Sequence, residues 1–497
     1  MSSAAQIAEL LAEVARLRAD LEQTRTELQQ TRTELQRATA RVAALEAENT
    51  ALREENAALR ARLRGREKTR PPGDEGGSEE APKPPRRRPP SGRKRGGQPG
   101  HDPSHRALLP VEQVDQVVPL KPKSCRACGK ALSGSDPKPS RRQVTEIPRP
   151  EPIVTEYQQH ALKCSCGVVT RADLPDGVPI GAFGPRLLAV VGICSGLYRL
   201  SKRQTQELLR DLFGVEMGLG SVPQCERIVS DAIAGPVEEA REHVQKQASA
   251  HLDETSWYEG HVKSYLWTMA TTWVTVFMIA THRSAKIARS LLGTFSGILV
   301  SDRLKSYDFW PLRRRQFCWA HLERRFEEFL DCGVEARRVG KGLLAEVRLL
   351  WSWWHRVRDG PLKRSTFQTY MRPLRRRVLA LLREGAACSH DGVAGTCREL
   401  LASEAALWTF VRVEGVEPTN NAAERALRHG VIWRRTSHGT DSTAGSRFVE
   451  RVLTVVMSLR QQDRNVLDFV CDAVQAALTG GRVPSLLPDA ARDAKAA

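Results

Sequence analysis

The sequence predicts a multidomain α+β protein, and three observations lead to that prediction. Heptads fill residues 1–65, five strand-like runs lie between residues 251 and 319, and helical periodicity lies on both sides of those runs. At 497 residues, 41% of them hydrophobic, the chain exceeds one ordinary domain and can bury at least one sizeable core.

The chain is strongly basic. Its 76 Lys and Arg residues against 58 Asp and Glu residues give a net charge of +18. This balance favours a polyanionic partner, and nucleic acid is the leading candidate. An arginine-rich proteome is the alternative explanation.

Composition also bears on location. No apolar run approaches the roughly 20 residues that a membrane helix needs, and the first residues lack the apolar segment of a secretion signal. The 11 cysteines are odd in number and mostly scattered singly, which argues against a disulfide framework. We therefore expect a cytoplasmic protein with no membrane partner.

Residues 1–65 predict a coiled coil. From Ile7 to Leu63, mostly apolar residues recur at two positions of each heptad. In a parallel dimer each g position faces an e position of the partner helix. Six such pairs are complementary: Glu13–Arg18, Asp20–Arg25, Glu27–Arg32, Arg41–Glu46, Glu48–Arg53 and Glu55–Arg60. Asn49 and Asn56 at core positions favour an in-register homodimer over residues 7–63, with a solitary charged helix as the alternative.

The next two segments predict a linker and a zinc-binding domain. Residues 66–106 are rich in Pro, Gly and charge, so we expect a disordered basic linker that contacts DNA phosphates through Arg93, Lys94 and Arg95. A plain solubilising linker is the alternative. Within residues 107–180, two cysteine pairs suit tetrahedral Zn²⁺ in a structural role, against buried or degenerate cysteines. The predicted thiolate ligands are Cys125, Cys128, Cys164 and Cys166.

Residues 181–245 are helical in pattern throughout. Ser201–Phe213 and Ser221–Ile233, joined by a turn that contains glycine, predict a helix-turn-helix that binds DNA. Ordinary helix packing is an equally good interpretation of these residues. Neither helix has a recognisable base-reading face.

Residues 246–450 carry the expected chemistry. Strands are predicted at His251–Tyr258, Ser264–Thr271 and Trp273–Thr281, and a helix at Ser284–Leu292 follows them. Two further strands are predicted at Gly297–Ser301 and Gln316–Trp319. Three strands, a helix and two more strands is the order of an RNase H-like core.

That strand order suggests a functional role for two aspartates. Asp253 lies in the first strand and Asp302 ends the fourth, and these strands are neighbours in such a sheet. Carboxylate oxygens are the ligands that Mg²⁺ prefers, and two divalent ions about 4 Å apart support phosphodiester transfer. We therefore predict that both aspartates bind catalytic Mg²⁺ or Mn²⁺. Glu254 should point to the opposite face, and Asp308 is a weaker competitor for Asp302.

Glu424 is the third predicted ligand, with a competing interpretation. It lies in the first turns of a helix that begins near Thr419. Asn421 followed three residues later by Glu424 also fits a capping box, in which the glutamate binds the cap N–H. Arg425 and Arg428, on the same helix, are predicted to contact DNA phosphate.

The rest of the chain predicts helices. A helical insertion at about 326–410 separates Asp302 from Glu424, and a C-terminal helical segment with a tail occupies 451–497. CWAH, from Cys318 to His321, resembles half of a zinc site. No matching pair lies nearby in the sequence, so we expect this motif to pack or to contact substrate.

Several motifs together resemble the insertion sequence 66 family of DDE transposases. The similar segments are RKRGGQPGH at Arg93–His101, LDET at Leu252–Thr255, SDRLKSYD at Ser301–Asp308, CWAH, NNAAERALR at Asn420–Arg428 and RQQDRNVLDFV at Arg460–Val470. The resemblance implies a DDE triad of Asp253, Asp302 and Glu424. It also implies double-stranded DNA partners, namely terminal inverted repeats and target, and small co-encoded accessory proteins. Arg303 and Leu304 depart from the Gly-Tyr that the family often has there.

The sequence thus predicts a bacterial, nucleoid-associated transposase that cleaves DNA and transfers strands with Mg²⁺. One alternative is a catalytically inactive, transposase-derived zinc and coiled-coil protein that binds DNA. Another is an RNase H-like nuclease that hydrolyses DNA without joining it.

Overall fold

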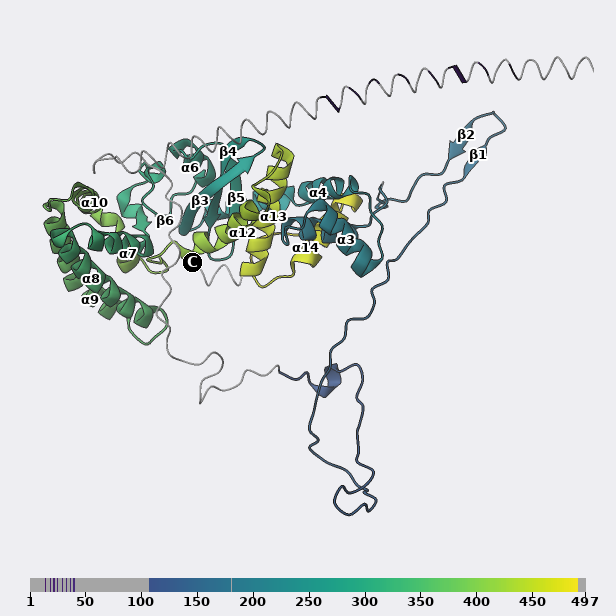
Figure 1. Ribbon diagram of the computed structural model, residues 1–497, viewed down its shortest axis with the longest axis horizontal. Helices are drawn as coiled ribbons and strands as arrows, with labels where there is room; N and C mark the ends of the chain where they lie inside the picture. The colour runs from purple at the N-terminus through teal and green to yellow at the C-terminus, as the bar shows by residue number, and fades with distance from the viewer. Residues whose placement is uncertain are drawn as a thin grey trace, which may run out of the picture. The chain divides into compact units, whose positions relative to one another are not determined.

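The computed structural model describes residues 107–179 and 181–489, together with single positions between 14 and 40. It contains two compact units, Met1–Gln143 and Val144–Ala497 (Figure 1). The described positions between 14 and 40 are all helical. The predicted coiled-coil dimer otherwise lies outside the described residues, and so does the basic linker with Arg93, Lys94 and Arg95.

The described part of the first unit has little regular structure. A 3₁₀ turn, η1, spans Val111–Gln113. An isolated bridge pairs Ser124 with Ala131 around the first cysteine pair. Arg141 donates to the carbonyl of Leu109 at 2.6 Å and ties the ends of this segment together.

The second unit begins with an antiparallel hairpin. Strand β1 spans Ala161–Lys163 and β2 spans Val169–Arg171. The second cysteine pair lies in the turn between them. The range predicted as one zinc-binding domain, 107–180, is therefore divided between the two units.

Four helices follow: α2 at Pro185–Gly196, α3 at Lys202–Phe213, α4 at Ser221–Ala232 and α5 at Ala234–Gln245. The predicted helices at 201–213 and 221–233 form to within one residue at each end. Ser201 and Gln204 make a reciprocal capping box at the start of α3, and Gly214 ends it at φ 63°. These local signals explain why the sequence predicts where this helix begins and ends.

A five-stranded mixed sheet forms the centre of the second unit, in the order β5-β4-β3-β6-β7. The strands are β3 at Ser249–Glu259, β4 at Val262–Ala270, β5 at Thr275–Ala280, β6 at Ile298–Ser301 and β7 at Arg315–Phe317. The first three are antiparallel, whereas β3–β6 and β6–β7 are parallel. Helix α6, Ala285–Leu292, makes the connection to β6. The predicted strand and helix order is confirmed.

The exposed edge of β5 is closed by a helix. Helix α13, Thr443–Gln461, packs against β5. Three alternate backbone N–H groups of the strand donate to side chains one helical turn apart: Thr275 to Ser458, Phe277 to Thr454 and Ile279 to Glu450. A covered edge cannot pair with another chain. Because α13 is one continuous helix, the predicted boundary at residue 451 falls inside it and is wrong.

Helices α12, Asn421–Ser437, and α14, Val466–Thr479, complete the packing around the sheet. Helix α12 packs on β3 and β4. A Cβ at Gly430 would lie 2.2 Å from Leu266 Cδ2, so the glycine permits this close approach. Buried Trp257, Leu266 and Leu427 fill the interface.

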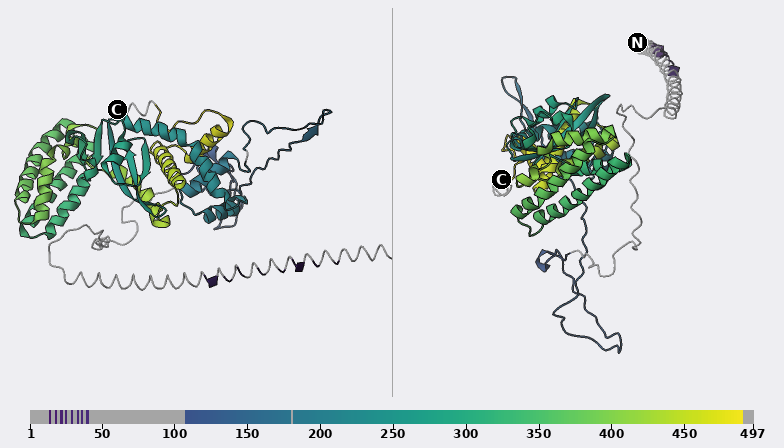
Figure 2. Two further views of the ribbon diagram at one scale, coloured as in Figure 1. Left: turned by 90° about the horizontal axis from the view of Figure 1, so that it is seen from above. Right: turned by 90° about the vertical axis from the view of Figure 1, so that its left-hand side faces the viewer.

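The predicted insertion is a helical bundle with its own hydrophobic core. It contains α7 at Trp319–Glu328, α8 at Val334–Arg358, α9 at Arg364–Ala386, α10 at Asp391–Ala402 and the short α11 at Thr409–Arg412. The sheet lies between this bundle and the helices α2–α5, α13 and α14 (Figure 2). The insertion begins earlier than the predicted residue 326. Trp319, predicted as the end of a strand, starts α7 because the strand ends at Phe317.

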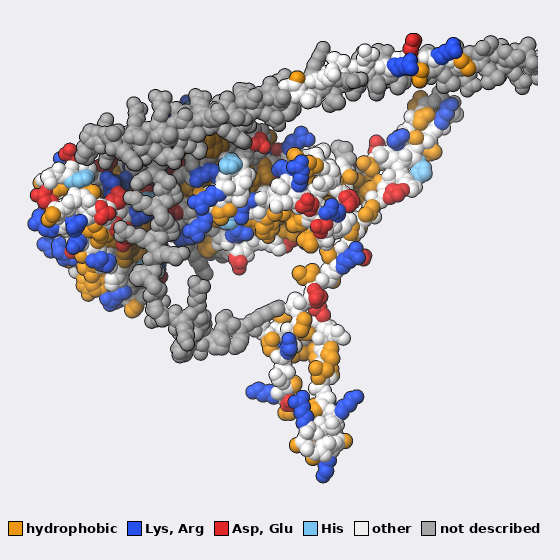
Figure 3. Space-filling model, viewed as in Figure 1, with side chains coloured by type: hydrophobic (Ala, Val, Ile, Leu, Met, Phe, Trp, Pro, Cys, Tyr) orange, Lys and Arg blue, Asp and Glu red, His pale blue; other side chains and the backbone are white. Residues whose placement is uncertain are grey.

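Within the described residues, the structure has no helix long and apolar enough to cross a membrane. Lys and Arg side chains gather over the insertion at the left of Figure 3. Arg375 and Arg377 of that surface pair with Glu404 and Glu346 at 2.7 Å each.

Candidate active site

Asp253 lies on β3, and Asp302 directly follows the adjacent parallel strand β6. The pairing of β3 with β6 ends at His251 opposite Val300. Each aspartate lies two residues further along, Asp253 within β3 and Asp302 directly after β6. Because side chains two apart on a strand share a face, Asp253 projects on the same side of β3 as His251. The fold thus brings together the two aspartates predicted from the sequence.

The electrostatics around Asp253 reflect this crowding. Burial, followed by the charges of Glu254 and Asp302, raises the pKa of Asp253 to about 8, and Glu424 contributes in the same direction. The backbone N–H of Glu254 donates to Asp253 Oδ1 at 3.0 Å and offsets part of this effect. Several carboxylates that repel one another at one place form a donor set that a divalent cation would stabilise.

The loop after β6 holds Asp302 in place. The N–H of Leu304 donates to Asp302 Oδ1 at 2.9 Å, and Arg315 Nη2 donates to the Asp302 carbonyl at 3.3 Å. Arg303 points away and pairs with Glu399 of α10 at 2.9 Å. Asp308, the weaker competitor, pairs with Arg315 at 3.2 Å.

Glu254 lies on the opposite face of β3 from Asp253, as predicted. Its side chain is only 1% exposed and pairs with Arg283 at 2.6 Å. The hydroxyl of Tyr307 donates to its other carboxylate oxygen. This buried network anchors the loop after β6, which contains Tyr307, to strand β3.

The first turn of α12 carries Glu424 to the same place. Asn420 precedes the helix and donates from Nδ2 to the Leu252 carbonyl at 2.7 Å, one residue before Asp253. The start of α12 has no side-chain cap hydrogen bond, and Asn420 rather than Asn421 occupies the cap position. The capping-box interpretation of Asn421 and Glu424 is therefore wrong. Among the described residues, no group hydrogen-bonds to Glu424 Oε1.

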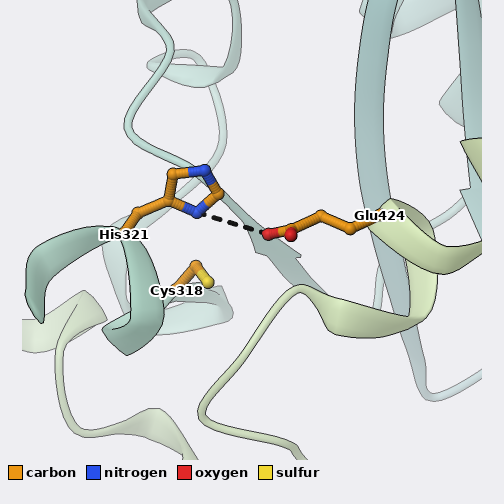
Figure 4. Close-up of side chains that lie close together, drawn as sticks. All are labelled: Cys318, His321 and Glu424. Atoms are coloured by element: carbon orange, nitrogen blue, oxygen red, sulfur yellow. Dashed lines mark ion pairs between the residues drawn. The ribbon is translucent and has the colours of Figure 1, made fainter. Parts of the chain in front are cut away.

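Glu424 instead faces the CWAH motif (Figure 4). Its Oε1 lies 3.5 Å from His321 Nδ1. Among the described residues, Cys318, His321 and Glu424 are the group of three metal-ligand side chains whose donor atoms all lie within 4.8 Å of one another. The two aspartates are outside that group. The sequence offered no matching pair near CWAH, and folding brings Glu424 to it from a distant part of the chain.

Backbone contacts lock the two motifs together. The Asn420 N–H donates to Cys318 Sγ at 3.2 Å, and the Trp319 N–H donates to the Pro418 carbonyl at 2.9 Å. Burial and the positive charge of the nearby Arg324 lower the pKa of His321. The lowered pKa favours a neutral imidazole. The sequence predicted that CWAH packs or contacts substrate, and the contact of His321 with Glu424 is visible only in the tertiary structure.

The predicted zinc ligands lie in the two units, with Cys125 and Cys128 in the first and Cys164 and Cys166 in the second. Each pair occupies a tight turn, closed over four residues at Cys125 and over three at Cys164. The N–H of Gly129 donates to the Cys125 carbonyl and that of Gly167 to the Cys164 carbonyl, both at 2.9 Å. These glycines have φ of 72° and 91°. Such turns suit a pair of metal-binding thiolates, while the four-cysteine site stays a prediction.

Of the predicted DNA-contacting residues, Arg425 and Arg428 are exposed on α12. Arg425 directly follows Glu424 and lines a cavity beside it. This geometry provides cations next to clustered carboxylates, as a phosphate-handling site requires.

Comparisons with known proteins identify the family of this chain and two relatives. A family model described as "Transposase IS66 family" matches residues 181–447, a range that contains all three predicted carboxylates. A protein of Sinorhizobium fredii, "Uncharacterized protein y4qI", is 24% identical over 413 residues, covering 76% of this chain and 75% of the relative. A second from the same organism, "Uncharacterized protein y4hP", is 22% identical over 400 residues, covering 72% and 71%.

Proposed function

This chain belongs to the IS66 family of transposases, and from that premise we propose that it cleaves the DNA ends of its element and joins them to target DNA through Asp253, Asp302 and Glu424. The observation that carries the proposal is the position of Asp253 and Asp302 on adjacent parallel strands. The bond from Asn420 to Leu252, which docks the helix of Glu424 on the same strand, supports it further.

The three carboxylates are proposed to hold two Mg²⁺ or Mn²⁺ ions. When bound, such ions activate the attacking oxygen and stabilise the leaving oxygen of an in-line phosphoryl transfer. The residues fit this role, because Asp253 bears the repulsion of neighbouring carboxylates and oxygen donors suit these ions. Arg425 and Arg428 would orient the DNA phosphate, and water followed by a freed 3′-hydroxyl would be the nucleophiles.

The other parts of the chain are proposed to assemble the protein on DNA in the bacterial nucleoid. Residues 1–65 would form a parallel coiled-coil homodimer, and residues 66–106, with Arg93, Lys94 and Arg95, would contact phosphates. Residues 107–180 would bind structural Zn²⁺ through Cys125, Cys128, Cys164 and Cys166. Residues 181–245 are the candidate helix-turn-helix for the inverted repeats. Small co-encoded accessory proteins are the proposed additional partners.

The test is incubation of the full-length protein with labelled element ends, Mg²⁺ and target plasmid, scoring nicks and joined products separately. Asp253→Asn, Asp302→Asn and Glu424→Gln are each expected to abolish end cleavage while DNA binding persists. Asp308→Asn is the matched control, because Asp308 is a nearby exposed carboxylate that pairs with Arg315. Full cleavage by any of the three variants would remove that residue from the catalytic set.

The same assay separates the two alternative functions. A catalytically inactive DNA-binding protein would bind ends in EDTA and in Mg²⁺ alike and leave them uncut. An RNase H-like nuclease would nick ends but fail to join pre-cut ends to the plasmid.

A further inference from the structure

A cavity of about 430 Å³ adjoins the candidate active site. Three of its lining residues are near neighbours of site residues along the chain. His251 lies two residues before Asp253 on the same face of β3, Ala320 precedes His321, and Arg425 follows Glu424. A ligand in the cavity would therefore lie next to the proposed reaction centre.

One wall of the cavity is an aromatic face of α8. Trp351, Trp354, His355 and Arg358 all line it. Their spacing of three, four and seven residues places them on one side of the helix. Trp353 is absent from this wall and packs on Tyr370, with ring centroids 4.5 Å apart.

The aromatic wall is held rigid before any ligand arrives. Trp354 is buried against Phe367 and Phe410, and Trp351 Nε1 donates to Glu323 at 2.9 Å. The rings of Trp351 and His355 are nearly parallel, at 19° with centroids 6.5 Å apart. Parallel aromatic surfaces of this kind can stack on any of the four nucleobases.

A second wall carries Arg425 and the backbone N–H groups of a helix start. It comes from the first turn of α12 and the residues just before it, including Thr419, Asn421 and Arg425. N–H groups at a helix start attract phosphate. The one lining carboxylate is Glu417. Burial raises its pKa, and the positive charges of Arg358 and Arg425 lower it. The cavity lining thus contains two arginines against one glutamate.

We propose that this cavity binds one unpaired nucleotide of the DNA substrate, with its base stacked on Trp351 and His355 and its phosphate against Arg358 and Arg425. The inference rests on the proposed function, since it supplies the DNA. The volume lies within the range of small-ligand pockets and excludes a duplex. An already unpaired base enters without the cost of unstacking and unpairing, so frayed or forked ends are the preferred ligand.

The test uses a forked duplex that carries one unpaired 2-aminopurine nucleotide, with the full-length protein and no added Mg²⁺ or Mn²⁺ so that no cleavage occurs. Stacking on an aromatic ring is expected to quench the 2-aminopurine fluorescence. Trp351→Ala is expected to abolish most of the quenching and to weaken fork binding roughly tenfold, the usual loss when one base–aromatic stack is removed. Binding of the fully paired duplex should stay unchanged.

Two further variants make the result decisive. Trp353→Ala, on the same helix but outside the cavity, is the matched control and should quench and bind like the wild type. Arg358→Ala changes an exposed side chain, so it should fold even if Trp351→Ala does not, and it should weaken fork binding more than duplex binding. Equal loss on fork and duplex for Arg358→Ala, or wild-type quenching by a folded Trp351→Ala, would overturn the proposal.

Failure of the cavity proposal and failure of the proposed function give different results. A protein that cleaves element ends but shows no dependence on Trp351 in the fork assay retains its transposase function and lacks this binding site. A protein that quenches the unpaired base through Trp351 but cleaves no ends in Mg²⁺ retains the binding site and contradicts the catalytic proposal.

Discussion

Asn420 donates from Nδ2 to the carbonyl oxygen of Leu252 at 2.7 Å, and this single bond fixes the first turn of α12 beside the strand that carries Asp253. Asn420 is fully buried. Its own backbone N–H donates to Cys318 Sγ, so one residue connects the β3, CWAH and Glu424 segments.

Asn420→Ala is expected to misplace Glu424 and to leave the Leu252 carbonyl unsatisfied. The loss of a buried hydrogen bond should cost about 1–3 kcal/mol of unfolding free energy. As a positioning residue, Asn420 should also affect metal use, so the variant should need more Mg²⁺ for half-maximal end cleavage. Thr436→Ala, at the exposed end of α12, is the control. An unchanged Mg²⁺ requirement would show that Asn420 has a structural role only.

The raised pKa of Asp253 predicts a pH dependence of the metal-free protein. Because its pKa of about 8 in the folded chain exceeds the ordinary value of 3.8, the stability that protonated Asp253 contributes is complete below about pH 4 and is lost as the pH rises towards 8. Asp253→Asn removes this loss, so in EDTA at pH 8 its Tm should exceed that of the wild type by at least about 2 °C, the change expected for roughly 1 kcal/mol. At pH 4 the two Tm values should converge. A constant difference across the range would contradict the assignment.

His321→Ala is expected to lower end cleavage, because its imidazole faces Glu424 at 3.5 Å. Nitrogen ligands suit Mn²⁺ better than Mg²⁺. The variant should therefore lose more of the Mn²⁺-supported activity, and its Mn²⁺ affinity, read by electron paramagnetic resonance, should fall. His282→Ala changes an exposed histidine outside the group of Cys318, His321 and Glu424 and should behave like the wild type. Equal Mn²⁺ affinity in both variants would show that His321 packs in the fold and does not bind the metal.

Thr454→Val tests how α13 closes the edge of the sheet. The change preserves shape but removes the oxygen that accepts the Phe277 N–H at 3.1 Å. A buried donor without a partner should cost about 1–3 kcal/mol in urea unfolding. Thr479→Val, at an exposed position, should cost almost nothing. A loss below about 0.5 kcal/mol at Thr454 would mean that the N–H finds another acceptor.

Zinc content tests the cysteine pairs. The purified chain is expected to contain one Zn²⁺, and Cys125→Ser or Cys164→Ser should each remove it, because a tetrahedral structural site needs all four ligands. Elemental analysis of the protein provides the measurement. Cys332→Ser, outside both pairs, is the control. Full zinc content in either ligand variant would favour degenerate cysteines.

Local patterns predicted much of the second unit. Alternating apolar residues revealed the order of the strands, and Ser201 and Gln204 marked the start of α3, because side chains report their neighbours two to four positions away. The predicted end of β7 was wrong because a local pattern does not show distant packing. Trp319 is a residue type typical of strands, but its buried side chain packs in the helical insertion.

The sequence alone determined that Asp253 and Asp302 lie on strands that neighbour each other, since a sheet with this strand order has few permitted topologies. It favoured a metal ligand over a helix cap for Glu424 without excluding the cap, and it offered no matching pair for CWAH. Only the tertiary structure excludes the cap and shows the contact of Glu424 with His321 and the cavity between α8 and α12, because these depend on how the helical insertion packs against the sheet. Residues that meet only through such packing have no shared local pattern in the sequence.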